Sequence, residues 1–76
     1  MSDIPEWTPV VGSSRIVAEC YLSDAETILV RFPDGIEWQY RACPLATWLA
    51  FTAPGQSRGA FIREELDHKP NCRWTG

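Results

Sequence analysis

The turn sequence Pro33-Asp34-Gly35 joins two segments of alternating character, and it constrains the fold more than any other feature of the chain. A short Asp-Gly turn between β-branched and aromatic segments is a strong local signal for an antiparallel hairpin. The first strand is predicted over 27–32 and the second over 35–41. Because side chains alternate along a strand, Trp38 and Tyr40 share one face. The chain is therefore expected to contain a hairpin with two large aromatic rings on one side.

A third strand is predicted before this hairpin. Between Ser14 and Leu22, apolar residues at 16, 18, 20 and 22 alternate with a second set at 17, 19 and 21, which is typical of a half-buried strand. The polar residues 23–26 form the turn that leads into the hairpin. The predicted sheet is thus a three-stranded antiparallel meander.

Two short helices are predicted after the sheet. Pro44 suits the first position of a helix, where a backbone N–H is not needed, and apolar residues follow at helical spacing until Pro54-Gly55. Ser57 is suited to cap a second helix over roughly 58–67. Both helices are amphipathic, so each has a stripe that can cover the sheet.

The predicted fold class is α+β: a three-stranded antiparallel β-meander followed by two short helices packed on one face, in the order βββαα. The core is expected to combine one sheet face with the apolar stripes of both helices: Ile16, Ile28, Val30, Ile36, Trp38, Leu45, Trp48, Leu49, Phe61, Ile62 and Leu66. The other sheet face is expected to be open, with these residues exposed: Tyr21, Arg31, Gln39 and Arg41.

The 76 residues are enough for one domain, which buries about 60–65% of the surface that its unfolded chain exposes. Residues 1–12 are predicted to form an extended arm that lies against the domain through Trp7 and Val10. Residues 13–69 form the folded domain, and 70–76 a tail that is loose apart from Trp74. No segment approaches the roughly 20 apolar residues of a membrane span, and the N-terminus lacks a signal-peptide pattern. We expect a cytoplasmic protein with reduced thiols and no membrane partner.

The charge balance weighs against nucleic acid as a partner. Seven Lys and Arg residues stand against ten Asp and Glu, which gives a formal net charge of −3. Nucleic-acid-binding domains usually carry a basic excess that releases counterions from phosphates. However, most of the basic residues are arginines, and a local arginine cluster can act within an acidic protein.

Two aromatic rings and several arginines are the candidates for a binding surface. Trp38 and Tyr40 either stack on bases or partner side chains, or pack in the core. The arginines form either a path for phosphates and carboxylates or ordinary surface pairs with glutamates: Arg31, Arg41, Arg58 and Arg63. Ser13 and Ser14 are either a functional pair or, more commonly for such serines, bonded to nearby backbone.

Neither a catalytic residue nor a metal site is predicted. No base is evident beside Ser13-Ser14, and the single histidine lies near the chain's end, where it is poorly placed to activate a nucleophile. A zinc site would need paired ligands such as Cys-x₂-Cys. The possible ligands offer only one close pair, His68 and Cys72, with Cys20 and Cys43 far away in sequence. We expect no cofactor.

Several short motifs occur in an order that resembles a known family. They are Ser13-Ser14-Arg15-Ile16, Tyr21, Leu29-Val30-Arg31-Phe32 with Gly35, Trp38-Gln39-Tyr40, and Pro44 followed by Ser57-Arg58-Gly59-Ala60-Phe61. This pattern, over about 11–66, resembles the KTSC domain, which is named for the C-terminus of some lysyl-tRNA synthetases and also occurs alone. The resemblance agrees with the predicted order of elements. It implies a domain of unestablished function for which RNA binding has been suggested by association.

Two binding hypotheses follow, and an enzyme is not expected. The first is a small non-catalytic module that engages a protein partner, as an inhibitor or accessory factor, through exposed aromatics and the N-terminal arm. The alternative is binding of RNA or another polyanion through a local aromatic and arginine surface. The residues assigned to partner or RNA binding are Trp38, Tyr40, Arg41, Arg58, Arg63, Ser13 and Ser14.

Overall fold

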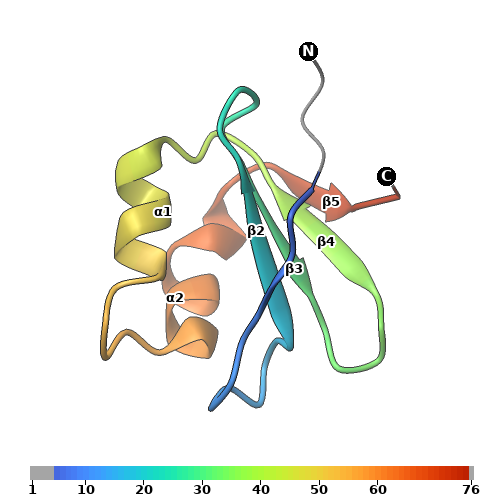
Figure 1. Ribbon diagram of the computed structural model, residues 1–76. Coiled ribbons are helices and arrows are strands. Elements are labelled where there is room, and N and C mark those ends of the chain that lie inside the picture. Colours follow the sequence, from blue (N-terminus) through green and yellow to red (C-terminus); the bar gives the residue numbers. More distant parts are fainter. Residues whose placement is uncertain (1–4, 76) are drawn as a thin grey trace.

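Five antiparallel strands form a single sheet in the order β1-β2-β3-β4-β5, with both α-helices on one side of it (Figure 1). The computed structural model describes residues 5–75, so the first four residues of the predicted arm and the last residue of the tail lie outside the described residues. The elements are β1 (Thr8–Pro9), β2 (Ala18–Leu22), β3 (Thr27–Arg31), β4 (Glu37–Tyr40), α1 (Leu45–Phe51), α2 (Arg58–Glu64), the 3₁₀-helix η1 (Leu66–His68) and β5 (Asn71–Arg73). The α+β class is confirmed.

The hairpin that dominated the sequence pattern connects β3 to β4. Gly35 donates its N–H to the carbonyl of Phe32 at 2.9 Å, and the Ile36 N–H reaches the Asp34 carboxylate at 3.0 Å. Gly35 has a φ of 91°, a conformation that a residue with a Cβ adopts at a cost. The turn therefore depends on the Asp34 carboxylate as a hydrogen-bond acceptor and on the positive φ that Gly35 adopts.

Two edge strands were missed, so the predicted three strands are five. Strand β1 pairs with β2 through Thr8 and Glu19, and β5 pairs with β4 through Cys72 and Gln39. The tail that was expected to be loose is thus part of the sheet. These strands are two and three residues long, too short to show alternation, and they form because neighbouring strands offer unpaired backbone groups.

The second helix begins where its capping residue predicted, because Ser57 caps α2 by accepting a hydrogen bond from the Ala60 N–H at 3.2 Å. It ends at Glu64, before the predicted end. Pro44 was predicted as the first residue of the first helix, but it precedes α1. The predicted face of α1 was partly wrong. Leu45 and Leu49 are 56% and 57% exposed, and Phe51, at the end of the helix, is fully buried.

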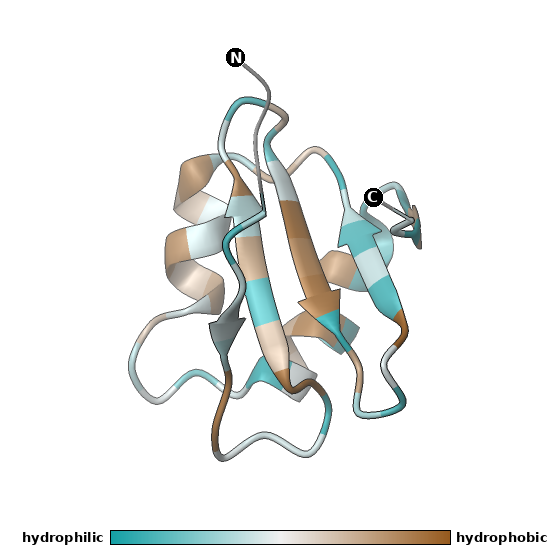
Figure 2. Ribbon diagram, turned by 45° about the vertical axis from the view of Figure 1, so that its right-hand side comes forward, coloured by the Kyte–Doolittle hydropathy of each residue, from teal (hydrophilic) through white to brown (hydrophobic). Residues whose placement is uncertain are grey.

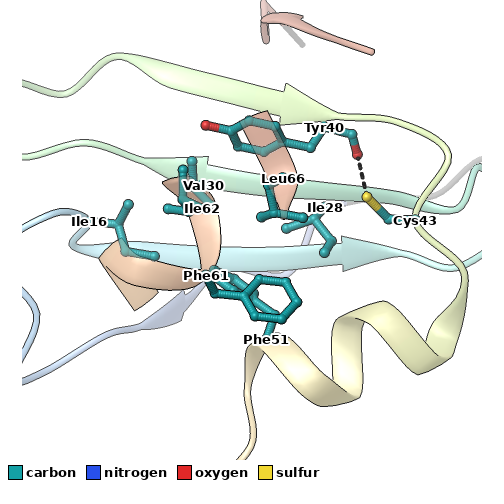
Figure 3. Packing of buried hydrophobic residues seen from close by; sticks show 9 residues of the cluster. All are labelled: Ile16, Ile28, Val30, Tyr40, Cys43, Phe51, Phe61, Ile62 and Leu66. Atoms are coloured by element: carbon teal, nitrogen blue, oxygen red, sulfur yellow. Dashed lines mark hydrogen bonds between the residues drawn. The ribbon is translucent and has the colours of Figure 1, made fainter. Parts of the chain in front are cut away.

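The main core lies between the sheet and the helices (Figure 3). Its buried members are Ile16, Ile28, Val30, Tyr40, Cys43, Phe51, Phe61, Ile62 and Leu66. Of the other predicted core residues, Ile36, Trp38 and Trp48 are only partly buried. Tyr21 was expected on the open face, but it stacks on Trp48 at 5.4 Å between ring centroids and donates its hydroxyl to the Cys43 carbonyl at 2.7 Å.

The face that was expected to be open also carries an apolar cluster. Cys20, Leu22 and Leu29 are buried there, with Trp7 and Trp74 packed against them. Leu29 is fully buried although it points away from the helices, so β3 has apolar contacts on both of its faces. Figure 2 shows this as hydrophobic colour along most of β3, in contrast to the more hydrophilic β4. Within residues 5–75, no helix combines the length and the apolar character needed to cross a membrane.

Candidate binding cleft

The two aromatic residues assigned to binding do not form an exposed platform. Tyr40 is 2% exposed and belongs to the main core, where burial and the nearby Asp67 charge raise the pKa of its hydroxyl to about 12. Trp38 is partly buried, with its ring 6.4 Å from that of Phe32. Its indole Nε1 donates to the Asn71 side-chain oxygen at 3.0 Å, which ties β4 to β5.

Arg58 serves a structural ion pair. Its Nε and Nη2 donate to the two carboxylate oxygens of Glu19 at 2.8 and 3.0 Å. Glu19 is 5% exposed, and the Arg58 guanidinium also lies 5.4 Å from the centre of the Phe51 ring. The hydrogen bond that Arg58 donates to Glu19 raises the pKa of Arg58; burial lowers this pKa by a smaller amount, and the negative charge of Glu19 raises it further. This pair joins the start of α2 to β2.

The remaining predicted arginines lie apart from one another. Arg63 is exposed on α2, with Glu64 at 3.8 Å. Arg41 is exposed after the end of β4, where its backbone N–H donates to Pro70. Arg31 is on the sheet face opposite the helices, where it binds Glu37 at 2.8 Å and lies 4.5 Å from the centre of the Trp7 ring. The arginines therefore do not line one path.

A cleft of about 250 Å³ lies between two segments that are distant in sequence, 10–15 and 56–59. It is lined by Val10, Val11, Gly12, Ser13, Ser14, Arg15, Gln56, Ser57, Arg58 and Gly59. The structure thus brings Ser13, Ser14 and Arg58 together, but with neighbours that were not predicted for binding.

Local hydrogen bonds shape the first wall of the cleft. The Ser13 hydroxyl oxygen accepts from the N–H groups of Arg15 and Ile16 at 3.2 and 3.4 Å, a serine turn of the kind expected at a strand entrance. Gly12 precedes it with a φ of 82°, which permits the sharp reversal. Val10 then pairs with Val17 through an N–H to carbonyl bond of 2.9 Å.

The second wall is the start of α2, where Gly59 faces Arg15 of the first wall. A Cβ added at Gly59 would lie 3.4 Å from the Cβ of Arg15, at the near limit of ordinary van der Waals contact. The ion pair of Arg58 with Glu19 holds this wall against the sheet. The cleft is therefore bordered by the approach of Gly59 to Arg15 and by the ion pair of Arg58 with Glu19.

The cleft is rich in hydrogen-bond donors and has no acidic residue in its lining. Arg15 has no ion pair within residues 5–75; its guanidinium lies 5.9 Å from the centre of the Phe32 ring. The Ser14 hydroxyl has no hydrogen-bond partner among the described residues. An arrangement of this kind is chemically suited to a group that accepts hydrogen bonds.

None of the three cysteines lines the cleft. Cys20 and Cys43 are buried, Cys72 is exposed, and within residues 5–75 no group of three His, Cys, Asp or Glu is placed to hold a metal ion. Burial raises the pKa of the Cys43 thiol, so this thiol is neutral at ordinary pH. It donates to the Tyr40 carbonyl at 3.4 Å (Figure 3).

The architecture is that of a small α+β domain with a five-stranded antiparallel sheet covered by helices on one face. Neither a protein-family model nor a curated protein matches the sequence. The crystal structure of a KTSC domain protein from Yersinia pestis is similar, with a TM-score of 0.81 and 23% sequence identity. The match covers 95% of this chain and 100% of that chain. The chain therefore has the KTSC domain fold, as its motifs indicated.

Sequence reasoning missed three polar residues of the cleft: Arg15, Gln56 and Ser57 as a wall residue rather than only a cap. The available signal was the resemblance, since Ser13-Ser14-Arg15 and Ser57-Arg58-Gly59 were both among its motifs. What the sequence did not reveal was that these two motifs meet, because more than forty residues separate them.

Proposed function

We propose that this protein is a non-catalytic binding module that engages a protein partner through the cleft between 10–15 and 56–59. One observation carries the proposal: a donor-lined cleft lies directly beside Val11, a side chain that is 92% exposed. Val17, which is 41% exposed, lies with Val11 in the segment that connects β1 to β2. Exposed apolar side chains next to polar groups that can donate hydrogen bonds are a combination that protein interfaces bury.

The chemistry of the cleft supports binding over catalysis. Its hydroxyls come from Ser13, Ser14 and Ser57, but its lining contains no His, Asp, Glu or Lys that could activate them. A serine hydroxyl without an adjacent base is a weak nucleophile. The side chains are therefore suited to holding a partner and not to transforming it.

RNA binding has less support than a protein partner. Tyr40 is in the core, Arg58 is held by Glu19, and Arg63 and Arg41 lie apart, so the aromatic and arginine surface on which that alternative depends does not form. The formal charge of −3 also opposes association with a polyanion.

Capture from lysate of the source cells, with and without nuclease treatment, tests the proposal. The bait proteins are the parent, Val11→Asp, and Leu49→Asp as a matched control on an exposed apolar residue of α1. We expect a protein that is retained by the parent and by Leu49→Asp but not by Val11→Asp, because a carboxylate at position 11 removes the apolar contact. Equal retention by all three baits, or loss of every captured protein after nuclease treatment, would contradict the proposal.

A further inference from the structure

We propose that two copies of this chain associate edge to edge through β5, with the two β5 strands antiparallel and the two Cys72 residues opposite each other. This inference goes beyond the proposed function, because it concerns a second surface that is separate from the cleft. Strand β5 is the last strand at one border of the sheet, and its three residues are all exposed (Figure 1). A border strand with outward backbone groups can pair with a further strand.

The hydrogen bonds between β4 and β5 show which backbone groups of β5 point outward. The Arg41 N–H donates to the Pro70 carbonyl at 2.7 Å, and the Trp74 N–H donates to the Glu37 carbonyl at 2.9 Å. Residues 70 and 74 therefore direct these groups towards β4. The direction alternates along an antiparallel strand, so the backbone of Cys72 also faces β4, whereas residues 71 and 73 face outward.

The outward backbone groups are the N–H and C=O of Asn71 and Arg73. The Arg73 carbonyl accepts a long bond from the Gln39 side chain, 3.4 Å, and its oxygen has a second lone pair for another donor. When a second β5 lies alongside with Cys72 at the centre, Asn71 is opposite the second copy's Arg73. Such a pair exchanges both of its backbone hydrogen bonds. The two-fold axis repeats this pair on the other side of Cys72.

The side chains around Cys72 are self-complementary in this register. The two Cys72 residues form a non-hydrogen-bonded pair, the closer type, in which the Cα atoms are about 4.5 Å apart. On the same face, Trp74 lies opposite the second copy's Pro70, so an indole ring meets an apolar ring. Pro70 has no N–H, but its backbone faces β4, and the new ladder does not need that donor. The segment therefore matches a second copy of itself.

The opposite border of the sheet favours a closed dimer over an open chain of copies. Strand β1 is two residues long, and Val10 after it donates its N–H inward to Val17, so Pro9 occupies the outward position, where it has no N–H to donate. Growth of the sheet from β5 to β1 is thus disfavoured, which leaves two-fold pairing of β5 with β5. The two Arg73 side chains become diagonal neighbours, roughly 7–8 Å apart, and physiological salt screens much of their repulsion.

Sedimentation equilibrium in reducing buffer tests the association. The parent should show a reversible monomer–dimer equilibrium with a dissociation constant on the order of 0.1–1 mM, weak because the contact is short. Cys72→Ser should associate as the parent does, since a serine is of similar size. Cys72→Lys places two ammonium groups opposite each other and should weaken association at least about tenfold.

Position 72 is exposed, so both variants should keep the parent's midpoint in a urea melt. If Cys72→Lys is not folded, Arg73→Pro takes its place. This change removes an outward N–H without removing a hydrogen bond to β4, and it should also weaken association.

Thiol–disulfide exchange tests the register. Two Cys72 thiols and one oxidised glutathione give one disulfide between the two copies and two reduced glutathione molecules. The matched control is the Cys72→Ser, Arg73→Cys variant, whose exposed thiol is in the same strand but meets that of the second copy only diagonally, beyond the usual reach of a disulfide. At equal concentration, and relative to the rate at which each thiol is glutathionylated, the covalent dimer should form at least about tenfold faster in the parent.

Three outcomes would overturn the inference. They are a parent that stays monomeric at about 1 mM, equal association of Cys72→Ser and Cys72→Lys, and equal rates of disulfide formation in the parent and the diagonal control. The cleft is tested by Val11→Asp and the dimer by changes in β5, so the failure of one proposal is distinguishable from the failure of the other.

Discussion

Arg58 and Glu19 illustrate how a charged residue with a plausible binding role can be occupied by the fold itself. Their side chains are 20% and 7% exposed, against 70% and 65% for the pair of Arg63 and Glu64. In the exposed pair, water and salt screen the attraction, so its contribution is small. In the buried pair, the loss of one member leaves the other charge without compensation.

Arg58→Ala is therefore expected to lower the free energy of unfolding by about 3–5 kcal/mol, because the buried Glu19 carboxylate loses its partner. Arg63→Ala is the matched control on the same helix and should change stability by less than about 0.5 kcal/mol. Urea melts of the two variants measure the difference. If their midpoints coincide, the Arg58 pair is not a stabilising contact.

Tyr40 is the second residue whose burial has a measurable consequence. Its pKa is raised to about 12 in the folded protein, against about 10 in an unfolded chain. Between these values the unfolded state loses a proton that the folded state retains. Stability should therefore be complete below about pH 10 and fall as the pH rises towards about 12.

Tyr40→Phe should show a shallower loss of stability over that alkaline range, in urea melts at successive pH values. Burial also raises the pKa of Tyr21, so a smaller dependence is expected to remain. Changing both tyrosines to phenylalanine should reduce it further. A Tyr40→Phe protein with the same alkaline slope as the parent would show that Tyr40 does not cause it.

At the scale of elements, α1 presents two apolar sides and only one is buried. Leu45 and Leu49 face outward, while Trp48 and Phe51 contact the core, with 6.0 Å between their ring centroids. Phe51 also packs against Phe61 of α2 at 5.4 Å. The helix is therefore anchored by aromatic contacts at its C-terminal end.

Phe51→Ala is expected to cost about 3–5 kcal/mol, since it opens a cavity between the two helices. Leu49→Ala, in the same helix but 57% exposed, should cost less than about 1 kcal/mol. Thermal or urea unfolding of both variants tests the assignment of faces. A larger loss of stability for Leu49→Ala than for Phe51→Ala would mean that the leucine face of α1 is the buried one, as the leucine spacing predicted.

The edge strands bring Trp7 and Trp74 over the cluster on the other side of the sheet. In a Cys72→Ser background, the two remaining thiols are on opposite sides: Cys20 beneath the tryptophans and Cys43 in the main core. Trp74→Ala should make Cys20 react faster with a thiol reagent, because local opening exposes it more often. Cys43 is the internal control and should keep its slow rate. An unchanged Cys20 rate would mean that Trp74 does not shield it.

At the scale of the whole molecule, the acidic balance governs any contact with polyanions. A protein of formal charge −3 can place few arginines on phosphates, and each contact contributes a salt slope of about −0.7 for single strands. Fluorescence anisotropy with labelled single-stranded RNA should therefore show weak binding that disappears at moderate salt. Tight binding that persists at high salt and falls in an Arg41→Ala, Arg63→Ala variant would support the RNA alternative instead.

The sequence predicted the parts of this fold that depend on local chemistry. Asp34 and Gly35 act within one turn, and Ser57 caps its own helix, so neighbouring residues were sufficient evidence. The inner face of α1 was ambiguous, because Leu45 and Leu49 have the same helical spacing as a buried pair. Which face of α1 is buried depends on where the sheet lies relative to the helix, and the helix sequence alone does not contain this information.

The parts that escaped prediction depend on distant segments. Strand β5 becomes a strand because β4 lies beside it, and its three residues show no pattern of their own. Predicting the cleft required knowing that 10–15 and 56–59 meet, with Gly59 beside Arg15. The sequence therefore contained both motifs of the candidate site, but it did not show that they lie side by side.

The shared cluster beneath Trp7 and Trp74 links the two borders of the sheet. Strands β1 and β5 exchange no hydrogen bonds, since three strands separate them. Yet both tryptophans pack against the same cluster, which consists of Cys20, Leu22 and Leu29. If one edge strand and its tryptophan separate from the sheet, the cluster becomes partly exposed to water. The other tryptophan then packs against a less well buried apolar surface, and its edge strand is stabilised less. We therefore expect the two borders to be thermodynamically coupled across the width of the sheet, so that fraying at one of them promotes fraying at the other.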